Sequence, residues 1–349
     1  MRLPRPLLRQ LNRRARALPP GQHLDEQVAA ALAVHERFGP RSLEHYDPTH
    51  ARVVYARGIA PFQPRARPMA DVRDLTVTVP SSASGPDTTL LARAYRPHGA
   101  RDGGPAILYY HGGGGVIGSV DLYDRPCRII ADDTGFVVIS LEYRLAPEAP
   151  FPAAVEDAIG AFLWLQGHPD QLGLGVAIDP ARVIVAGDSM GGNLAAVASQ
   201  ALRERDVPNP ALQVLLYPGL DFTMQHPSHR EFADGYLLTH QLMTWFRSHY
   251  LTDESQRLDV RASPLLADDV SGLPPALIIT AGFDPLRDEG CRYAERLTEA
   301  GVAVRYRCEH SLIHGYINTL GLIAASRRAL EQMNRDIREL IEPGAPAAG

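Results

Sequence analysis

The sequence predicts an α/β fold: a mostly parallel sheet of about eight strands, with helices on both faces and a helical cap. First, the chain has 349 residues, 45% of them apolar, so it can bury a large core. Second, from about residue 71 short runs rich in Val, Ile, Leu and Tyr alternate with longer helical stretches. Third, residues 1–60 and 221–262 stand outside this alternation. We therefore expect one main domain with added cap segments.

The expected sheet opens with an antiparallel hairpin, because residues 72–79 and 90–96 flank the turn-forming run SSASGPD. Six further strands are expected at residues 106–110, 136–141, 183–186, 212–217, 276–281 and 302–308. The expected helices include residues 153–166, 191–205, 287–300 and 316–341.

Two segments are expected to form the cap. Residues 1–60 contain the amphipathic run HLDEQVAAALAVHERFG and predict an N-terminal helical cap segment. Residues 61–349 form the main domain, with a cap insertion at about 221–262 that contains THQLMTWFRSHYL. In a doubly wound sheet, ligands bind above the carboxyl ends of the strands, where insertions also leave. The tail EPGAPAAG is expected to be disordered.

Composition excludes several functions. A net charge of -5 argues against a nucleic-acid partner, which requires a basic surface. All 35 cationic residues are arginine, and the lack of lysine excludes Schiff-base chemistry, a P-loop and a Ser-x-x-Lys acylation site. Cys127, Cys291 and Cys308 are too scattered for a disulfide framework or a zinc cluster. We expect a cytoplasmic protein.

The N-terminal run MRLPRPLLRQLNRRARALPPG is rich in arginine but lacks the apolar core of a secretory signal. No run in the chain reaches membrane-spanning length. Four leucines near helical spacing leave contact with an anionic membrane surface as one interpretation. A solvated arm packed on its own protein is the favoured one, because Pro4 and Pro6 limit a helix at its start.

The run GDSMGG, residues 187–192, carries the first catalytic signal. It follows the apolar run VIVA and precedes a helical stretch, which is the context of a nucleophile elbow. In such a turn the glycines leave room where side chains would collide, and the hydroxyl of Ser189 stands clear of the sheet. The dipole of the following helix favours negative charge there. The alternative is a tight turn with an idle serine.

A serine nucleophile needs a base and an orienting acid at later strand ends. The run GFDPLRDEG places Asp284 directly after a strand, whereas Asp288 and Glu289 are interpreted as first-turn charges of the next helix. The run EHSLIHGY offers His310 and His314, and we choose His314 because it lies just before the helix. No third ligand accompanies this histidine pair, so no metal site is predicted.

The run HGGGG, residues 111–115, follows an expected strand. Consecutive glycines let backbone N–H groups approach an oxyanion, and this loop type forms half of an oxyanion hole. A phosphate-binding loop is excluded because its lysine is missing. A plain flexible loop is the remaining alternative.

These motifs resemble the hormone-sensitive lipase family of α/β hydrolases, in its bacterial esterase branch. The resemblance implies the α/β-hydrolase fold, with residues 61–349 as the catalytic domain. Residues 1–60 match only in length and helical character. The resemblance runs through residues 71–335 in ordered blocks, which are ILYYHGGGGVIGS, VVISLEYRLAPEAPFPAAVEDA, VIVAGDSMGGNLAA, LLYPGLD, SPLLADDVSGLPPALIITAGFDPLRDEG and LIHGYIN.

The resemblance implies Ser189 as nucleophile, His314 as general base and then acid, and Asp284 as the orienting carboxylate, without metal or cofactor. It implies that the oxyanion donors are the N–H groups of Gly113, Gly114 and Met190. It also implies structural roles for His111, which anchors the glycine loop, and for the run YRLAPE; Glu148 and Asp157 are interpreted as solvated or loop-pinning carboxylates.

Three residues depart from the family pattern. Met190 stands where alanine is usual and is expected to narrow the pocket. Gly115 stands where an aromatic residue is usual and is expected to widen it, and Tyr316 replaces the common phenylalanine. None of these three departures changes a triad residue, so they are expected to affect the range of substrates and not the presence of activity.

The sequence therefore predicts a carboxylesterase, a serine hydrolase that acts on short to medium acyl esters, with a small-molecule ester as its partner. Two alternatives stay open: an amidase, peptidase or acyltransferase with the same machinery, and a small-molecule receptor on the same fold. A homodimer is a further possibility, because the last strand leaves a sheet edge. The candidate pocket residues are Tyr217, Phe222, Met224, Leu238, Trp245 and Ile313.

Overall fold

A computed structural model describes residues 21–80, 87–205 and 207–343 of the chain. The arginine-rich N-terminal run, most of the SSASGPD turn and most of the C-terminal tail lie outside the described residues, so the expectations for them stay predictions. Among the described residues, no helix combines the length and the apolar character needed to cross a membrane.

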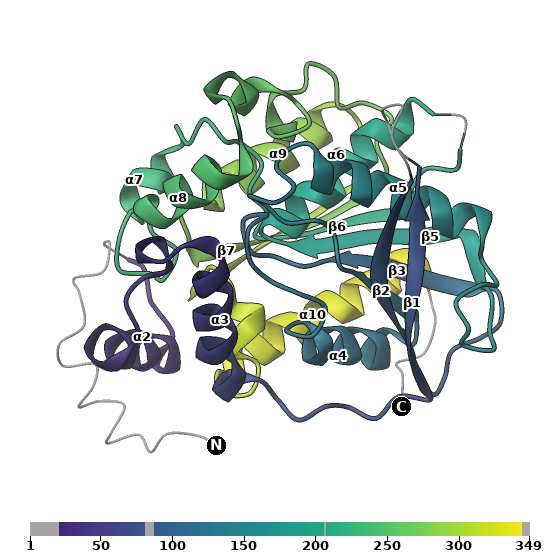
Figure 1. The fold of residues 1–349 in the computed structure, drawn as a ribbon, viewed down its shortest axis with the longest axis horizontal. Coiled ribbons are helices and arrows are strands. Elements are labelled where there is room, and N and C mark those ends of the chain that lie inside the picture. Colours follow the sequence, from purple (N-terminus) through teal and green to yellow (C-terminus); the bar gives the residue numbers. More distant parts are fainter. Residues whose placement is uncertain (1–20, 81–86, 206, 344–349) are drawn as a thin grey trace.

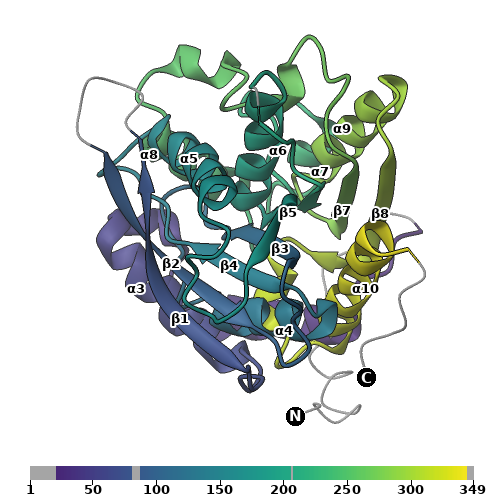
Figure 2. The same cartoon turned by 90° about the vertical axis from the view of Figure 1, so that its right-hand side faces the viewer.

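The sheet has eight strands, as predicted, in the order β1-β2-β4-β3-β5-β6-β7-β8. The pairs β1–β2 and β2–β4 are antiparallel, and the other neighbours are parallel. Figure 2 shows β1 and β2 at one side of the sheet and β7 and β8 at the other. The strands are β1 (Asp71–Val79), β2 (Thr88–Arg96), β3 (Gly104–Tyr110), β4 (Val137–Leu141), β5 (Ile178–Asp188), β6 (Leu212–Leu216), β7 (Ala276–Phe283) and β8 (Val304–Ile313).

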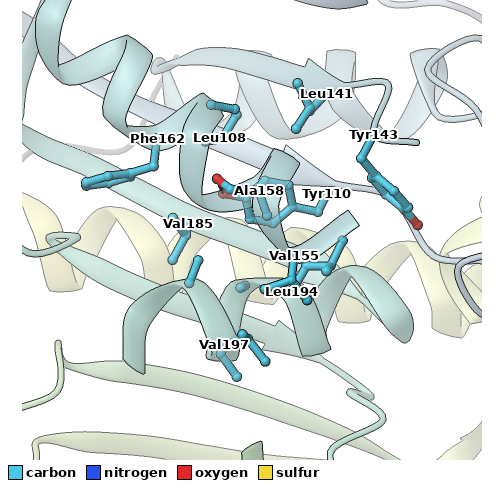
Figure 3. Packing of buried hydrophobic residues seen from close by; sticks show 14 of the residues in the cluster. Leu108, Tyr110, Leu141, Tyr143, Val155, Ala158, Phe162, Val185, Leu194 and Val197 are labelled. Carbon is cyan, nitrogen blue, oxygen red and sulfur yellow. Dashed lines mark hydrogen bonds between the residues drawn. The ribbon is translucent and has the colours of Figure 1, made fainter. Parts of the chain in front are cut away.

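Helices cover both faces of the sheet (Figure 1). The helices α5 (Ala153–Gly167), α6 (Met190–Arg203) and α9 (Arg287–Glu299) lie on one face, and α4 (Asp124–Thr134) and α10 (Ala324–Ile341) on the other. Successive strand residues alternate between the faces. Thus Leu108 and Tyr110 belong to the core under α5 and α6, drawn in Figure 3, whereas Ile107 and Tyr109 belong to the core beside α4 and α10.

The two segments predicted to form a cap lie together at one end of the sheet (Figure 1). The first contains α2 (Glu26–Phe38), η1 (Leu43–His45), α3 (Pro48–Ile59) and η2 (Ala60–Phe62). The second contains α7 (Pro227–Glu231), α8 (His240–Tyr250) and η3 (Glu254–Leu258), and the short η4 (Pro264–Leu266) follows it. The two segments meet where α8 contacts η1. The amphipathic run predicted to be helical forms α2, which begins after Asp25, whose side chain accepts the backbone N–H groups of Gln27 and Val28.

Two predicted boundaries near the C-terminus were wrong. Strand β8 continues to Ile313, past the expected end at residue 308, because an irregularity between Ala281 and Phe283 restores its pairing with β7. Gly282 makes this close approach possible, since a Cβ atom there would lie 2.2 Å from the carbonyl oxygen of His310. The helix expected at 316–341 is divided into η5 (Tyr316–Thr319) and α10. Between them the chain turns so that Gly321 N–H donates to the Phe62 carbonyl at 2.7 Å.

Candidate active site

Ser189 occupies a sharp turn between β5 and α6. Its backbone has φ 55° and ψ -117°, a strained conformation for a residue with a side chain. Only glycine fits at Gly187 and Gly191, because other backbone atoms occupy the space that a side chain would need. A Cβ atom on Gly187 would lie 2.3 Å from the carbonyl carbon of Gly191, and one on Gly191 would lie 1.8 Å from the carbonyl oxygen of Tyr110. The turn therefore has the geometry that the GDSMGG run predicts.

Three predicted side chains meet at this turn. His314 Nε2 lies 2.9 Å from Ser189 Oγ, and His314 Nδ1 lies 2.8 Å from Asp284 Oδ2. Asp284 is fully buried and its other oxygen accepts the Leu286 N–H at 2.9 Å. An ionised carboxylate only accepts hydrogen bonds, so it holds the proton on Nδ1 and leaves Nε2 free to accept from the serine hydroxyl. The rings of Tyr217 and His314 pack in a T-shaped arrangement, with centroids 4.8 Å apart.

The other titratable residues of these two loops lie elsewhere. His310 is within β8. Asp288 Oδ2 accepts the Ser228 N–H at 2.9 Å, and Glu289 Oε1 lies 2.7 Å from His229 Nε2. The Glu289–His229 pair is fully buried. Both acids lie in the first turn of α9, as predicted, and they also hold α7 against α9, a role that the sequence did not indicate.

The glycine loop after β3 lies beside the serine turn, because Tyr110 of β3 pairs with Gly187 of β5. Gly113, Gly114 and Gly115 all have positive φ, at 127°, 63° and 72°. A Cβ atom on Gly113 would lie 2.1 Å from the Ile117 carbonyl oxygen, so the loop turns too tightly for a side chain there. The start of the loop lies against the start of α6, because a Cβ atom on Gly191 would lie 2.8 Å from the carbonyl oxygen of His111.

His111 begins the glycine loop and is fully buried. Its ring stacks on Tyr143 with centroids 4.3 Å apart, and its Nδ1 lies 2.9 Å from the Gly112 carbonyl oxygen. Burial lowers the pKa of His111 to about 4, so the ring is neutral near pH 7. Tyr143 in turn donates to the His111 carbonyl at 2.8 Å.

The two carboxylates near YRLAPE also form ion pairs that pin loops. Arg52 of α3 donates to Glu148, and Arg144 donates to the buried Asp157, which also accepts the Arg144 N–H at 2.8 Å. Arg52 additionally donates to the carbonyl of Val116, just beyond the glycine loop. These contacts tie the cap and the loop after β4 to the site.

Two aromatic rings of α8 lie against the glycine loop. A Cβ atom on Gly114 would lie 2.3 Å from the ring of Phe246, and one on Gly115 would lie 2.7 Å from the ring of Tyr250. The ring of Tyr250 therefore lies directly beside Gly115, and the expectation that Gly115 widens the site stays a prediction. Sequence reasoning missed Phe246 and Tyr250, although both lie in the quoted cap run THQLMTWFRSHYL.

The six candidate pocket residues lie in three different surroundings. Met224, Leu238 and Trp245 belong to a small apolar cluster under the cap, together with Phe246 and with Leu286, two residues after Asp284. Of the other three, Phe222 stacks on Tyr250, while Tyr217 and Ile313 are buried in the core beside α4 and α10. Tyr217 directs its hydroxyl to Asp188 at 3.3 Å. This cluster lies beside Asp284, because Leu286 N–H donates to the carboxylate of Asp284. In the described part of the chain, no three His, Cys, Asp or Glu side chains gather as a metal site would require.

A family model described as the alpha/beta hydrolase fold matches residues 107–318, which is more than half of the chain and spans the glycine loop, the serine turn and His314. The chain belongs to the hormone-sensitive lipase family of α/β hydrolases, in its bacterial esterase branch. Members of this family are similar to it over nearly its whole length. It is 42% identical to the carboxylic ester hydrolase LipN of Mycobacterium tuberculosis over 344 residues, covering 96% of this chain and 88% of that protein.

Further relatives of this α/β hydrolase are esterases by name. It is 41% identical to the ethyl acetate hydrolase of Pseudomonas putida over 247 residues, 69% of this chain and 76% of that one. A solved thermostable esterase from Pseudomonas putida ECU1011 superimposes with a TM-score of 0.85 at 32% identity, covering 93% of this chain and 99% of that one. The chain is therefore an enzyme, a carboxylesterase.

Proposed function

We propose that this carboxylesterase hydrolyses short to medium acyl esters with a Ser189–His314–Asp284 triad, through an acyl-enzyme. The observation that carries the proposal is the continuous hydrogen-bonded line from Ser189 Oγ through both ring nitrogens of His314 to Asp284. In this hydrogen-bonded chain, His314 is the base for the weakly nucleophilic hydroxyl of Ser189, and Asp284 is the acid that orients the imidazole of His314.

Acylation begins when His314 Nε2 takes the proton of Ser189 and Oγ attacks the ester carbonyl carbon. The carbonyl oxygen becomes an oxyanion, and the proposed donors to it are the backbone N–H groups of Gly113, Gly114 and Met190. The buried carboxylate of Asp284 stabilises the imidazolium that forms and keeps its own charge. The positive φ values of the loop glycines support this assignment, since they allow successive N–H groups to face one point.

The tetrahedral intermediate collapses when His314 gives its proton to the departing alcohol oxygen, which leaves Ser189 acylated. Water then enters, His314 Nε2 takes one of its protons, and the hydroxyl oxygen attacks the acyl carbon. Collapse of this second intermediate returns the proton to Ser189 Oγ and releases the carboxylic acid. Atoms and charges balance over the cycle, which consumes one water and yields one alcohol and one acid.

The preference for short to medium acyl groups is supported by the cap. Phe246 and Tyr250 pack directly against the glycine loop, and the bulk of Met190 is buried beside the nucleophile. These groups reduce the space in which an acyl chain can extend. The relative named ethyl acetate hydrolase acts on a small ester by its name. We propose that residues 1–60 and the insertion at about 221–262 act as one cap over the catalytic domain, residues 61–349.

An amidase, peptidase or acyltransferase would use the same three residues, so the leaving group has to be tested directly. A set of p-nitrophenyl esters from acetate to palmitate, together with p-nitroacetanilide, tests both the reaction and the acyl length. We expect the highest kcat/KM between acetate and octanoate and little turnover of the anilide. A maximum at palmitate contradicts the length preference, and comparable anilide turnover contradicts the ester assignment. If the wild-type protein neither turns over an ester nor reacts with a fluorophosphonate, the result contradicts the assignment as a serine hydrolase and favours a small-molecule receptor on the same fold.

A further inference from the structure

Asp188, the residue before the proposed nucleophile, is 1% exposed and accepts four hydrogen bonds. Its Oδ1 accepts from Gly112 N–H and from the Tyr109 hydroxyl, both at 2.9 Å. Its Oδ2 accepts from the hydroxyls of Tyr123 at 3.0 Å and Tyr217 at 3.3 Å. The four donors come from β3, the glycine loop, the start of α4 and the loop after β6. One carboxylate thus joins four segments that meet at the carboxyl ends of the strands.

The donor set suits an ionised carboxylate, which accepts at both oxygens and donates nothing. Burial raises the pKa values of Tyr109, Tyr123 and Tyr217 well above 10, so all three hydroxyls keep their protons to donate. Burial also raises the pKa of Asp188, to about 6, and the tyrosine hydroxyls oppose this rise. The group is therefore an anion above neutral pH, and four donors compensate for its lost hydration.

The contact with Gly112 reaches the glycine loop directly. A Cβ atom on Gly112 would lie 2.5 Å from Asp188 Oδ2, so the backbone of the loop rests against the carboxylate. Gly112 is followed by Gly113 and Gly114, and Asp188 is followed by Ser189 and Met190. The hydrogen bond from Gly112 to Asp188 therefore links the two backbone segments that carry the proposed oxyanion donors. The first donor of the glycine loop is one residue after Gly112, and the donor at the start of α6 is two residues after Asp188.

A second layer of contacts connects this carboxylate to the histidine loop and the cap. Asn318, in the turn after His314, donates to the hydroxyls of Tyr123 at 3.4 Å and Tyr55 at 3.1 Å. Tyr55 belongs to α3 of the cap. The network around Asp188 therefore includes elements on both sides of the triad.

We propose that Asp188 is a positioning residue for ester hydrolysis, whose carboxylate holds the glycine loop and the nucleophile turn at the separation that aims their N–H groups at one oxyanion. The proposal rests on the proposed function. It assigns Asp188 no contact with the substrate. Asp188 positions the oxyanion donors through its hydrogen bond with Gly112. Loss of this contact should therefore raise the free energy of the transition state more than that of the bound ester.

The test compares Asp188→Asn with wild type on p-nitrophenyl butyrate. Asparagine keeps the shape and one acceptor oxygen, but its amide donates where Tyr123 or Tyr217 now donates. Active sites are counted by titration with a fluorophosphonate, and kcat is expressed per titrated site. We expect kcat per site to fall about 10- to 100-fold with KM changed less than about threefold, because a misaimed oxyanion donor costs mainly transition-state stabilisation.

Asp336→Asn is the matched control. Asp336 is also a buried carboxylate, but it pairs with Arg305 and Arg307 between β8 and α10, away from the serine turn. We expect this variant to lose thermal stability and to keep wild-type kcat per titrated site. Tyr109→Phe removes one donor and keeps the charge, and it provides a milder variant if Asp188→Asn does not fold. We expect its kcat per site to fall about threefold to tenfold.

Wild-type kcat per titrated site in both Asp188→Asn and Tyr109→Phe overturns the proposal, even where the number of active sites is reduced, because Asp188 is then only structural. A rise in KM with unchanged kcat also overturns it, since that result indicates a role in binding the ground state. Failure of the proposed function is recognised separately, because the wild-type protein itself then shows neither turnover nor titratable sites.

Discussion

The Nε2 atom of His314 lies 2.9 Å from the Oγ atom of Ser189, although 125 residues separate them in the chain. The contact joins the loop after β8 to the turn after β5, strands that β6 and β7 separate in the sheet. Because both strands run in the same direction, their carboxyl ends lie at one edge and their loops can meet above it.

Replacement of the proposed nucleophile is the first prediction. Ser189→Ala is expected to abolish fluorophosphonate labelling and to lower ester kcat by about 10⁵- to 10⁶-fold, because no other group in the line can attack the carbonyl. The control is Ser199→Ala, which removes a buried serine whose hydroxyl only donates to Ala195 within α6. Circular dichroism should report both variants as folded. Ester turnover near the wild-type rate in Ser189→Ala would refute the assignment.

Removal of the orienting charge is the second prediction. Asp284→Asn should lower kcat by about 10³- to 10⁴-fold, because an amide can stabilise the tautomer of His314 that has its proton on the wrong nitrogen. Asp288→Asn is the matched comparison in the same loop, where the carboxylate holds Ser228 of the cap. Its kcat should fall less than about tenfold. If Asp288→Asn is the more damaging of the two, the triad acid has been misassigned.

The aromatic wall over the glycine loop leads to the third prediction. Phe246→Ala should shift the preferred acyl chain toward longer esters, raising the kcat/KM ratio of p-nitrophenyl decanoate to butyrate by about tenfold, because the ring against Gly114 is removed. Leu258→Ala changes a cap residue that is 60% exposed and serves as the control. An unchanged ratio in Phe246→Ala would show that this ring does not limit the acyl chain.

The pH dependence of stability is the fourth prediction. The pKa of Asp188 is raised from 3.8 to about 6 in the folded protein, so the folded state binds this proton more tightly than the unfolded state does. The contribution of the protonated side chain to the free energy of unfolding is therefore fully present below about pH 4 and is lost as the pH rises through 6. An asparagine side chain cannot ionise, so the free energy of unfolding of Asp188→Asn relative to wild type should improve by about 2–3 kcal/mol from pH 4 to pH 8.

Urea unfolding at several pH values measures this difference. Taking the difference between variant and wild type cancels other titrations, such as that of His111, whose pKa is lowered and whose contribution is lost as the pH falls toward 4. Ser189→Ala keeps Asp188 and should follow the wild-type pH curve. A constant difference between Asp188→Asn and wild type across this range would contradict the raised pKa.

The predicted strands and helices were largely confirmed where the signal is local. Each of the eight predicted strand runs overlaps an observed strand, and the amphipathic run in the first predicted cap segment forms α2. The errors occurred where distant contacts decide the conformation. The irregularity between Ala281 and Phe283 prolongs β8, and the bond from Gly321 to Phe62 interrupts the helix expected at 316–341. Neither contact has a signal in the local sequence.

The sequence alone determined the sheet, the serine turn and the glycine loop, because the alternation of strand and helix patterns and the glycine-rich turn motifs are visible in the sequence itself. Only glycine fits at Gly187 and Gly191, because a Cβ atom at either position would lie 2.3 Å or less from a backbone atom. The tertiary structure decided what surrounds them. Tyr250 fills the space beside Gly115, and Asp188 accepts hydrogen bonds from four segments. Both contacts form only when segments far apart in the chain pack together, because a buried side chain must fill the space that its neighbours leave and a buried carboxylate must find its donors.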